Sequence, residues 1–549
     1  MIPELPDGKR GLHERGPAAT EAVRGEFAEQ LGDRIACDSI QKIGLEIGCD
    51  GQNHIVPPNV LFMLFALLYN DAKPMKILLI STNRNNLPMP VMPIGACIVA
   101  HAAEQAGHTV FLLDLMFTKD PLADIEAALA RWQPDVVALS VRNIDNADMR
   151  NSLFFLDGLQ SIVHTVRRRS GTPIILGGAA LGVMPEQILR LVPDCIAVIG
   201  DGELVFPQLL DRISRKESFA DLPSIAWIEK GDFRLNSFLS TGFSMTCPAP
   251  DYHRWLNIPT YRSRMATVPI QTKTGCQYNC VYCTYPKIEG NNCRLKNPAS
   301  IADAVLRFAT AGLRDIEIVD SVFNAPLEHA MAVCSALSRV RHTARLQCLE
   351  LNPRDFDDAL LTAMEQVGFV GMGITLESAS DPVLQGLSKG FTCRDVHNAA
   401  AVVARHRIPC AWIFLFGGPG ETLETVRETL QFAKKHIRPK DVAFFNAGIR
   451  IYPGTELETI ARAQGQLSQP AEEMLAPLFY LSPEVDAEWL DRELKNAMSS
   501  QMNFINMAAM SHSLLPAIHR ISHALGLLPP LWRHTGIIRR GLRLAGVDV

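Results

Sequence analysis

Three cysteines stand close together near the middle of the sequence. Cys276, Cys280 and Cys283 follow one another in C-x3-C-x2-C spacing within a polar segment that glycine and proline interrupt, GCQYNCVYCTYPKIEGNNCR. Thiolates at this spacing can hold three irons of a cubane cluster, and the fourth iron then has no protein ligand. A closed zinc site needs four ligands, and Cys293, ten residues further on, forms no second C-x2-C pair. Three inert core cysteines are the remaining alternative, but tight spacing in such a segment is not typical of a core. The pattern favours an iron–sulfur cluster.

The sequence around these cysteines resembles that of a known superfamily. C-x3-C-x-aromatic-C, with Tyr282 as the aromatic residue, is similar to the signature of radical S-adenosylmethionine (SAM) enzymes. The neighbouring segments PIQTKTGC and VYCTYPKIEG resemble those of the radical SAM enzymes that also carry a cobalamin-binding domain. This resemblance covers roughly residues 75–480. It implies three cofactors: a 4Fe–4S cluster on Cys276, Cys280 and Cys283, SAM bound through its amino and carboxylate groups to the open iron, and cobalamin.

Length and composition set the frame for this expectation. The chain has 549 residues, enough for two or three domains. Its net charge of −5 gives no general signal for nucleic-acid binding, and thirteen mostly scattered cysteines indicate a reduced, intracellular protein. The N-terminus lacks the apolar core of a secretory signal, and the longest apolar run, at 60–69, is too short to span a bilayer. We expect a cytoplasmic protein without a nucleic-acid partner.

The pattern predicts an α/β protein with two parallel sheets. Five apolar strands alternate with helical stretches, which is typical of a doubly wound, Rossmann-like domain, and six more strands follow. Six β/α units are too few for a closed eight-fold barrel and fit the open (β/α)6 barrel of the radical SAM family, with the cysteine loop after its first strand. The predicted regions are an N-terminal extension of unclear role (1–74, including Cys37 and Cys49), a cobalamin-binding-like domain (75–215), a connector with a domain boundary near 240 (216–266), the barrel (267–455) and a helical C-terminal region (456–549).

The ends of the first five strands carry the candidate cobalamin residues. Ligands of doubly wound sheets bind at the carboxyl ends of the strands, and a small hydroxyl or a glycine there lets a bulky cofactor approach the backbone. The Ser140, Gly177–Gly178 and Gly202 positions are similar to those of cobalamin-binding domains. Many such domains place a cobalt-ligating His after the first strand, but this loop contains Thr82 and Asn83 and no His. Water, no ligand, or a side chain such as Arg142 is expected on the lower face of the cobalt.

The ends of the barrel strands carry the candidate SAM residues. The resemblance implies polar contacts to the methionine part of SAM after the second, third and fourth strands, and adenine-side elements after the fifth and on the sixth. A single charged residue at a strand end more often serves as a solvated or capping group. Polar residues after several successive strands are therefore stronger evidence for a SAM site than any one of them. The candidates are Tyr282, Asp320, Ser321, Glu350, Glu377, Ser378, Gly418, Glu421 and Arg450.

The last part of the chain has an unusual charge distribution. After Glu493 no acidic residue occurs until Asp548, and the segment LLPPLWRHTGIIRRGLRL combines arginines with Trp532 and aliphatic residues. A basic amphipathic segment of this kind can lie on an anionic membrane surface. A helix that covers the barrel and exposes a basic face is an equally good interpretation.

The combined cofactors imply a radical enzyme that transfers a methyl group. The resemblance predicts transfer from SAM via methylcobalamin to an unactivated carbon of a lipid-like or secondary-metabolite substrate, with electrons from a donor such as flavodoxin or ferredoxin. Cyclisation, rearrangement or oxidation with the same cofactors is one alternative, and a non-catalytic iron–sulfur or zinc sensor is another. Possible peripheral membrane contact through the C-terminus completes the expectations.

Overall fold

The computed structural model describes residues 73–238, 249–507 and 514–546. Almost all of the predicted N-terminal extension, with Cys37, Cys49 and the apolar run at 60–69, lies outside these residues, as does the predicted boundary near 240. The described part contains two seven-stranded sheets and two short hairpins.

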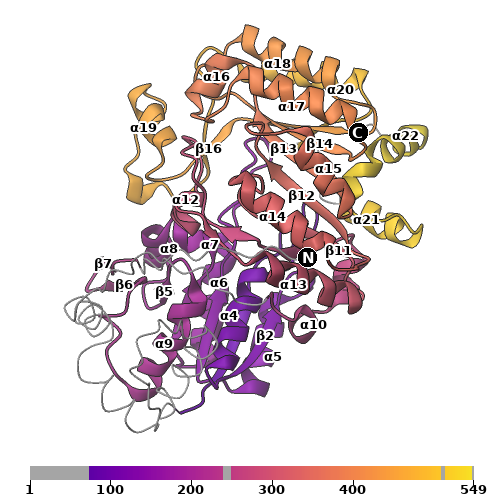
Figure 1. Cartoon of the computed structure of the whole chain (residues 1–549). Coiled ribbons are helices and arrows are strands. Elements are labelled where there is room, and N and C mark those ends of the chain that lie inside the picture. Colours follow the sequence, from indigo (N-terminus) through magenta and orange to yellow (C-terminus); the bar gives the residue numbers. More distant parts are fainter. Residues whose placement is uncertain (1–72, 239–248, 508–513, 547–549) are drawn as a thin grey trace, which may run out of the picture. The chain divides into compact units, whose positions relative to one another are not determined.

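The first sheet has the predicted doubly wound core and a small antiparallel extension (Figure 1). Strand β1 (KILLIS) buries Ile77 and Leu79 in one apolar cluster and Leu78 and Ile80 in another, so both faces of the sheet are covered. Strands β1 to β5 pair in parallel, whereas β6 and β7, from the predicted connector, pair antiparallel. In sheet order the strands are β2 Thr109–Asp114, β1 Lys76–Ser81, β3 Val136–Ser140, β4 Ile174–Gly177, β5 Ile196–Val198, β6 Ile225–Glu229 and β7 Asp232–Leu235.

Helices cover both faces of this sheet. Helices α4 and α9 pack together and share one apolar cluster, while α5 and α6 pair in the other. Asp120 caps α5 by accepting from the Ala123 amide, with Pro121 in the first turn, a typical helix start. The helices are α4 Ile94–Gln105, α5 Pro121–Trp132, α6 Leu156–Arg169, α7 Ala179–Val183, α8 Pro185–Leu191 and α9 Gly202–Arg215.

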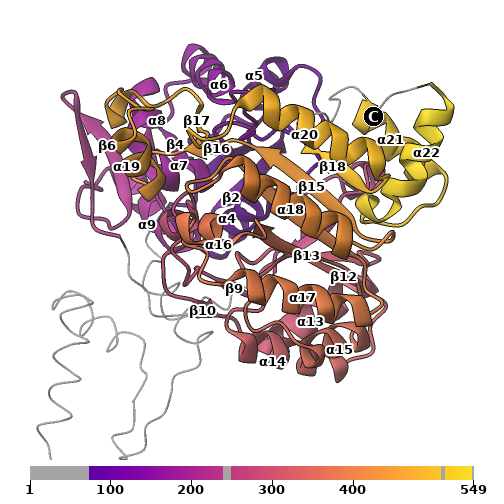
Figure 2. The same ribbon diagram turned by 90° about the horizontal axis from the view of Figure 1, so that it is seen from above.

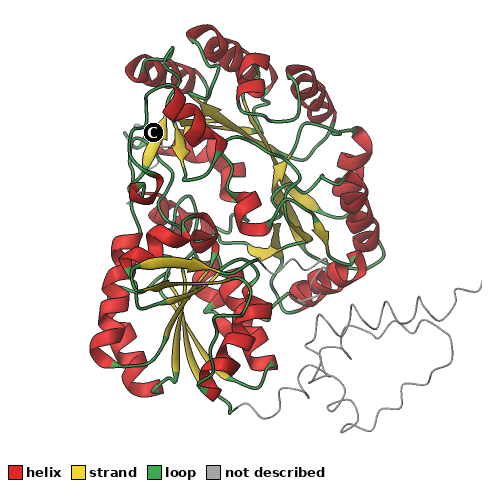
Figure 3. Cartoon of the chain, turned by 90° about the vertical axis from the view of Figure 1, so that its left-hand side faces the viewer, coloured by secondary structure: helices red, strands yellow, loops and turns green. Residues whose placement is uncertain are grey.

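The second sheet is entirely parallel and contains the six predicted barrel strands plus a seventh (Figure 3). The seventh, β18, comes from the C-terminal region, which was predicted to be helical, and pairs with β15. The chain leaves this sheet at Gly448, whose left-handed backbone (φ +77°) ends β15 and turns the chain into a separate hairpin. In sheet order the strands are β18 Phe504–Asn506, β15 Val442–Ala447, β14 Cys410–Phe416, β13 Phe369–Glu377, β12 Arg345–Leu351, β11 Asp315–Ile318 and β8 Val268–Ile270.

Long helices cover one face of the second sheet, along the strands in Figure 2. The apolar residues of these helices form one cluster with alternate strand residues such as Ile316, Cys348 and Trp412. The opposite, inner face carries the intervening residues, which include Glu317, Gln347 and Thr375. The helices of this region are α10 Tyr252–Trp255, α11 Ile258–Arg262, α13 Pro298–Thr310, α14 Leu327–Ser338, α15 Asp358–Gln366, α16 Asp381–Gly386, α17 Cys393–Arg405, α18 Leu423–His436 and α20 Ala487–Ser500.

Smaller elements complete the described chain. One hairpin joins β9 to β10 around the cysteine loop, and the other joins β16 to β17 beyond Gly448. Two helices and a short 3-10 turn form the C-terminal end. The bounds are β9 Lys273–Thr274, α12 Tyr285–Glu289, β10 Arg294–Leu295, β16 Ile449–Ile451, α19 Glu456–Ala463, η1 Ala471–Glu473, β17 Leu478–Tyr480, α21 Leu514–Ala524, η3 Leu531–His534 and α22 Thr535–Leu544.

A buried ion pair links the loop after β3 to strand β16. The Arg450 Nε donates to Asp145 Oδ2 at 2.8 Å, and both side chains are almost fully buried. The ring of Tyr452 lies against the Arg450 guanidinium, 4.6 Å from it. A second pair, Arg150 with Asp491 at 2.7 Å, joins the same loop to helix α20 at the surface.

Removing the buried acid should destabilise the protein much more than removing the surface acid. Asp145→Ala leaves the Arg450 charge buried without its partner, which costs about 3–5 kcal/mol of unfolding free energy. Asp491→Ala breaks an exposed pair and should cost less than about 1 kcal/mol. Urea titration of both variants measures the difference, and equal losses would contradict this account of the contact.

Candidate active site

The cysteine loop follows β8 and is held in place by side chains at the end of β11. The Asp320 carboxylate accepts from the backbone amides of Thr272 (2.7 Å) and Lys273 (3.3 Å). The Ser321 hydroxyl donates to the Gly275 carbonyl at 2.8 Å. Gly275 has φ +88°, and a Cβ there would lie 2.2 Å from the Asn292 carbonyl oxygen, so the loop requires glycine at this position. Asp320 and Ser321 therefore position the loop, and the SAM contact predicted for them stays a prediction.

The three loop cysteines lie near one another. Burial, together with the neighbouring Cys280 and Cys276 thiols, raises the pKa of Cys283 to about 12. Burial also raises the pKa of Cys280, while the Lys389 ammonium lowers it. Among the described residues no three acidic, cysteine or histidine side chains converge on one metal ion. Each cysteine of a cubane cluster ligates a different iron, so such convergence is not required of these three.

A buried network of three side chains lies beside the loop. The Tyr282 hydroxyl donates to a Glu377 carboxylate oxygen, and Lys389 forms an ion pair with the other oxygen at 2.7 Å. Lys389 also reaches the Tyr282 hydroxyl at 3.2 Å. Glu377 has φ +60°, a strained backbone for a residue with a side chain, at the end of β13. Burial acts to lower the pKa of Lys389, but Glu377 and Cys280 oppose this and raise it overall.

Sequence reasoning found Tyr282 and Glu377 but missed Lys389. This lysine belongs to the loop after α16, between Gly386 and Gly390, and no spacing pattern relates it to the cysteines. The fold places its ammonium beside the thiols, where it is 6% exposed. A cation at this position favours the thiolate forms that bind iron.

A group of polar side chains lines the inner face of the second sheet. The Glu350 carboxylate accepts from the Thr375 hydroxyl at 2.7 Å, and burial raises the pKa of Glu350 to about 7. The Glu317 carboxylate accepts from Thr267 and from Gln347 (2.8 Å), and burial raises its pKa as well. The Glu350 carboxyl group can therefore hold a proton near neutral pH, and burial favours the protonated form of Glu317 as well.

Arg142 and Tyr285 extend this polar group. Burial lowers the pKa of the Arg142 guanidinium, whereas the nearby Tyr285 hydroxyl and Glu317 carboxylate act in the opposite direction. The Tyr285 side chain is nevertheless 40% exposed, and the Arg142 side chain is exposed too. Both groups are surrounded by protein yet reachable by solvent, as expected for side chains that project into an open interior space. Arg142 as a residue on the lower face of cobalt stays a prediction.

Other predicted SAM residues are engaged in structural contacts. The Ser378 hydroxyl pairs with Thr429 of α18 at 3.0 Å, and Arg450 belongs to the buried ion pair with Asp145. The Glu421 carboxylate accepts from the Gly417 amide and, at 3.3 Å, from the Gly418 amide, so it shapes its own loop. A Cβ at Gly418 would lie 3.0 Å from a Leu387 methyl group. A direct SAM contact of these four residues stays a prediction.

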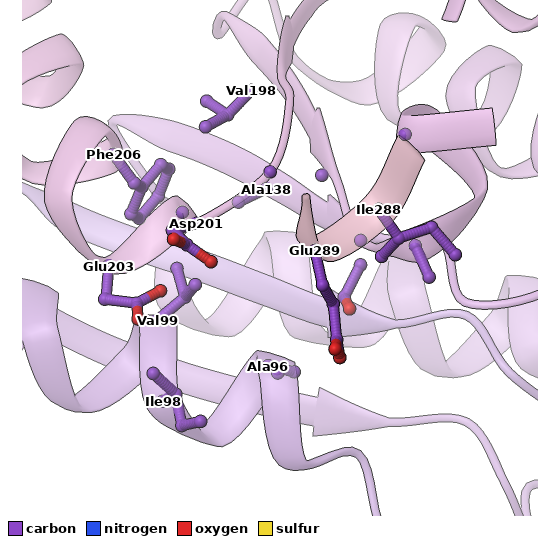
Figure 4. A pocket seen from close by; sticks show the side chains of 18 of the residues that line it. Ala96, Ile98, Val99, Ala138, Val198, Asp201, Glu203, Phe206, Ile288 and Glu289 are labelled. Atoms are coloured by element: carbon purple, nitrogen blue, oxygen red, sulfur yellow. The ribbon is translucent and has the colours of Figure 1, made fainter. Parts of the chain in front are cut away.

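A cavity of about 210 Å³ lies at the carboxyl end of the first sheet (Figure 4). Ser140, Gly177, Gly178 and Gly202, all predicted from the sequence, line it. A Cβ at Gly178 would lie 2.6 Å from the Val141 carbonyl oxygen, and the φ of +99° also requires glycine. The absence of side chains at these glycines keeps the space beside the strands open.

The cavity also borders the flanks of the cysteine loop. Thr274 and Glu289, on either side of the loop, contribute to its wall together with Asp201 and Glu203 of the first domain. The Arg294 guanidinium forms an ion pair with Asp201 across this boundary. Gly182 of α7 packs on Ile288 of α12, where a Cβ would lie 3.1 Å from the Ile288 Cα. The two candidate cofactor sites thus share a wall.

Two predicted cobalamin residues lie in the first-strand loop, next to this edge. The Thr82 hydroxyl donates to the Ser140 carbonyl at 3.0 Å. Asn83 is buried, its Oδ1 accepts from the Asn85 amide at 3.1 Å, and its Nδ2 has no hydrogen-bond partner among the described residues. Thr82 and Asn83 as cobalamin contacts stay a prediction.

Family comparisons agree with this two-part geometry. The model described as B12 binding domain matches residues 80–210, and the model described as Radical SAM superfamily matches residues 270–433. The chain therefore carries a B12 binding domain followed by a radical SAM domain. The predicted domain types are confirmed, and this radical SAM enzyme has both folds in the predicted order.

Curated relatives are distant. The chain is 24% identical to an uncharacterized methyltransferase of Pyrococcus horikoshii, with 68% of this chain and 79% of that protein covered. It is 22% identical to a tryptophan 2-C-methyltransferase of Streptomyces laurentii, with 68% and 72% covered. A hopanoid C-3 methylase of Methylococcus capsulatus is 24% identical over 45% of each chain.

Solved structures show the same fold. The radical SAM methyltransferase TsrM from Kitasatospora setae, with cobalamin and a 4Fe–4S cluster bound, superposes with a TM-score of 0.74 at 21% identity, covering 86% of this chain and all of that one. The cobalamin-dependent SAM radical enzyme OxsB gives 0.61 at 16% identity, covering 87% of this chain and 76% of that one. At these identities the likeness establishes the fold alone. In the described part of the chain no helix is both long enough and apolar enough to cross a membrane.

The buried carboxyl group of Glu421 should make stability depend on pH. Burial raises its pKa from 4.5 to about 7, so the folded state binds this proton more tightly than the unfolded chain. The free energy of unfolding should therefore fall as the pH rises from about 5 to 8, by about 3 kcal/mol from this group. Denaturant titrations of wild type and Glu421→Gln across this range measure the effect, because the glutamine does not titrate.

The matched control is Glu424→Gln. Glu424 lies three residues away at the exposed start of α18, so its replacement should leave the pH profile unchanged. A profile as steep in Glu421→Gln as in wild type would contradict the assignment.

Proposed function

We propose that this protein is a cobalamin-dependent radical SAM methyltransferase. It uses a 4Fe–4S cluster, SAM and cobalamin to methylate an unactivated carbon of a lipid-like or secondary-metabolite substrate. The observation that carries the proposal is the wall that the first-sheet cavity shares with the flanks of the cysteine loop. Methyl transfer is further supported by the relatives described above, which include two enzymes that methylate carbon.

The residues present fit the proposed cofactors. Three neighbouring thiols and an adjacent buried ammonium suit a cluster with one open iron. The glycine-lined cavity suits the approach of a large ring with amide side chains. Burial raises the pKa of Glu203 and Glu289 in its wall and so favours the protonated carboxyl group, which can both donate to and accept from amides. When bound, the cluster and SAM supply one-electron radical chemistry, and cobalamin supplies a metal that can carry a methyl group.

The chain's own residues position these groups and control their environment. Asp320 and Ser321 fix the backbone of the cysteine loop, so the three thiols keep one arrangement. The network of Tyr282, Glu377 and Lys389 compensates the negative charge that ligation requires of the thiols. Glu350, with a pKa of about 7, can hold or release a proton beside the reacting groups.

Methyl-labelled SAM tests the function directly. Anaerobically reconstituted protein with reductant should transfer the label to a small molecule from an extract of its host. Cys276→Ala should lose the cluster absorbance and lower transfer at least about a thousandfold, because no other group supplies this chemistry. Cys334→Ala, a buried cysteine of α14, is the control that should keep both.

The outcomes also separate the alternatives. A 5′-deoxyadenosine product without label transfer would favour cyclisation, rearrangement or oxidation. Bound zinc with no iron would leave only the sensor alternative. Replacing the chemical reductant by flavodoxin or ferredoxin in the same assay tests the predicted electron donor.

We also propose that the C-terminal helices make peripheral contact with an anionic membrane. Ile537 and Leu544 of α22 are 71% and 91% exposed, and with Arg540 they occupy one face of the helix. Leu525, after α21, is 75% exposed. Apolar side chains among arginines, in a segment without acids, suit the surface of anionic lipids.

Vesicle sedimentation tests the membrane contact. The double variant Ile537→Glu, Leu544→Glu should bind phosphatidylglycerol vesicles at least about tenfold less than wild type, because two apolar side chains are lost from the contact. Phe238→Glu is the matched control, since Phe238 is 58% exposed and lies outside the C-terminal helices. Equal binding of all three proteins would exclude this surface as the contact.

A further inference from the structure

A second cavity, of about 330 Å³, lies against the inner face of the second sheet. Leu349 of β12, Ile413 of β14 and Phe444 of β15 form its floor, and residues of α21, η3 and α22 form its roof. Its volume is within the range of small-molecule sites, about 300–1,000 Å³. None of the residues predicted from the sequence to bind a cofactor lines it.

Glycines of β13 allow close packing beside this cavity. Strand β13 lies between β12 and β14, and it carries Gly371 and Gly373 two residues apart. A Cβ at Gly373 would lie 2.5 Å from the Leu349 carbonyl oxygen. A Cβ at Gly371 would lie 2.9 Å from the Trp532 ring, so the indole packs directly on this bare stretch of backbone. The C-terminal region therefore packs closely on the inner face of β13 beside the cavity, with the Trp532 side chain in the cavity wall.

The lining of the cavity is almost free of available charge. Burial lowers the pKa of His519 to about 4, so this imidazole is neutral at pH 7. The Arg539 guanidinium donates to the backbone carbonyls of Gln501 (3.1 Å) and Phe504 (2.6 Å). Most other lining side chains are aliphatic or aromatic. Apolar cavities of this kind stay dry and take up hydrocarbons.

The cavity borders the polar groups of the candidate active site. Leu349 lines the cavity, and the next residue, Glu350, accepts from Thr375 on the inner face. A register irregularity between Cys348 and Leu351 brings both neighbours to this side. Pro88 and Met89, from the loop after β1 of the B12 binding domain, also line the cavity. One end of an apolar molecule bound in this cavity would therefore lie near Glu350 of the barrel and near the loop of Pro88 and Met89 from the B12 binding domain.

We propose that this cavity binds the hydrocarbon portion of the substrate, an acyl chain, an isoprenoid chain or a fused apolar ring. The bound molecule is called a substrate because of the proposed function. The binding of a hydrocarbon group in the cavity does not depend on that function. The roof of C-terminal helices defines the apolar site, and the polar group at Glu350 lies where the reacting part of the molecule ends.

A fluorescent fatty acid, cis-parinaric acid, tests the cavity in the full-length protein. Ile538 of α22 lines the cavity, whereas its neighbour Ile537 is exposed on the same helix. Ile538→Trp fills space that at least two methylene groups would occupy, so it should weaken binding of the probe at least about tenfold. Ile537→Trp is the matched control and should bind like wild type. Ile518→Trp, on α21, blocks the cavity from another element and should repeat the loss if Ile538→Trp does not fold.

The outcomes distinguish this inference from the proposed function. Probe binding is also measured in Cys276→Ala, which should bind as wild type does because the cavity does not use the cluster. Saturable binding that both cavity variants lose supports the inference even if no label is ever transferred from SAM. Absence of saturable binding, or equal binding by wild type and the cavity variants, overturns it even if methyl transfer is found.

Discussion

The buried pair of Asp145 and Arg450 fixes how the B12 binding domain meets the barrel. Asp145 follows β3 of the first sheet, and Arg450 stands on β16, just beyond the turn at Gly448. Two buried charges are tolerated only when they stay paired, so the contact permits few alternative arrangements. The ion pair of Arg294 with Asp201 adds a second restraint near the cysteine loop. The cavity shared by both domains depends on this fixed arrangement.

Glycines allow close backbone packing around the candidate sites. At Gly178, beside the first-sheet cavity, and at Gly275, in the cysteine loop, a side chain would collide with a backbone carbonyl. On the inner face of the barrel, a side chain at Gly373 would collide with the Leu349 carbonyl, and one at Gly371 would collide with the Trp532 ring. Elsewhere the interiors are filled by aliphatic and aromatic residues, as close packing requires. Close packing therefore requires glycine at these positions.

Electrostatics separates the two halves of the barrel interior. Near the cysteine loop, Lys389 supplies a buried positive charge opposite Glu377 and the thiols. Along the inner face, burial raises the pKa of Glu317 and raises that of Glu350 to about 7, so the Glu350 carboxyl group can be neutral near physiological pH. Under the C-terminal helices charge is almost absent, because His519 is neutral and backbone carbonyls surround the Arg539 guanidinium. The barrel interior is thus charged near the cysteine loop and apolar under the C-terminal helices. This change suits a substrate with one reactive and one apolar end.

The sequence by itself determined the two domain types, and it predicted the three loop cysteines as cluster ligands. Apolar strands alternating with helices, and cysteines at fixed spacing, are local patterns that can be recognised without knowledge of the fold. The same local reasoning found Ser140, Gly177, Gly178 and Gly202, since strand ends of a parallel sheet meet at one edge. It could not show that Arg450 pairs with Asp145, that Ser378 faces α18, or that Lys389 lies beside the thiols. It also missed β18 and the cavity under α21 and α22. Those features join residues far apart in the chain, and only tertiary packing decides which distant side chains meet.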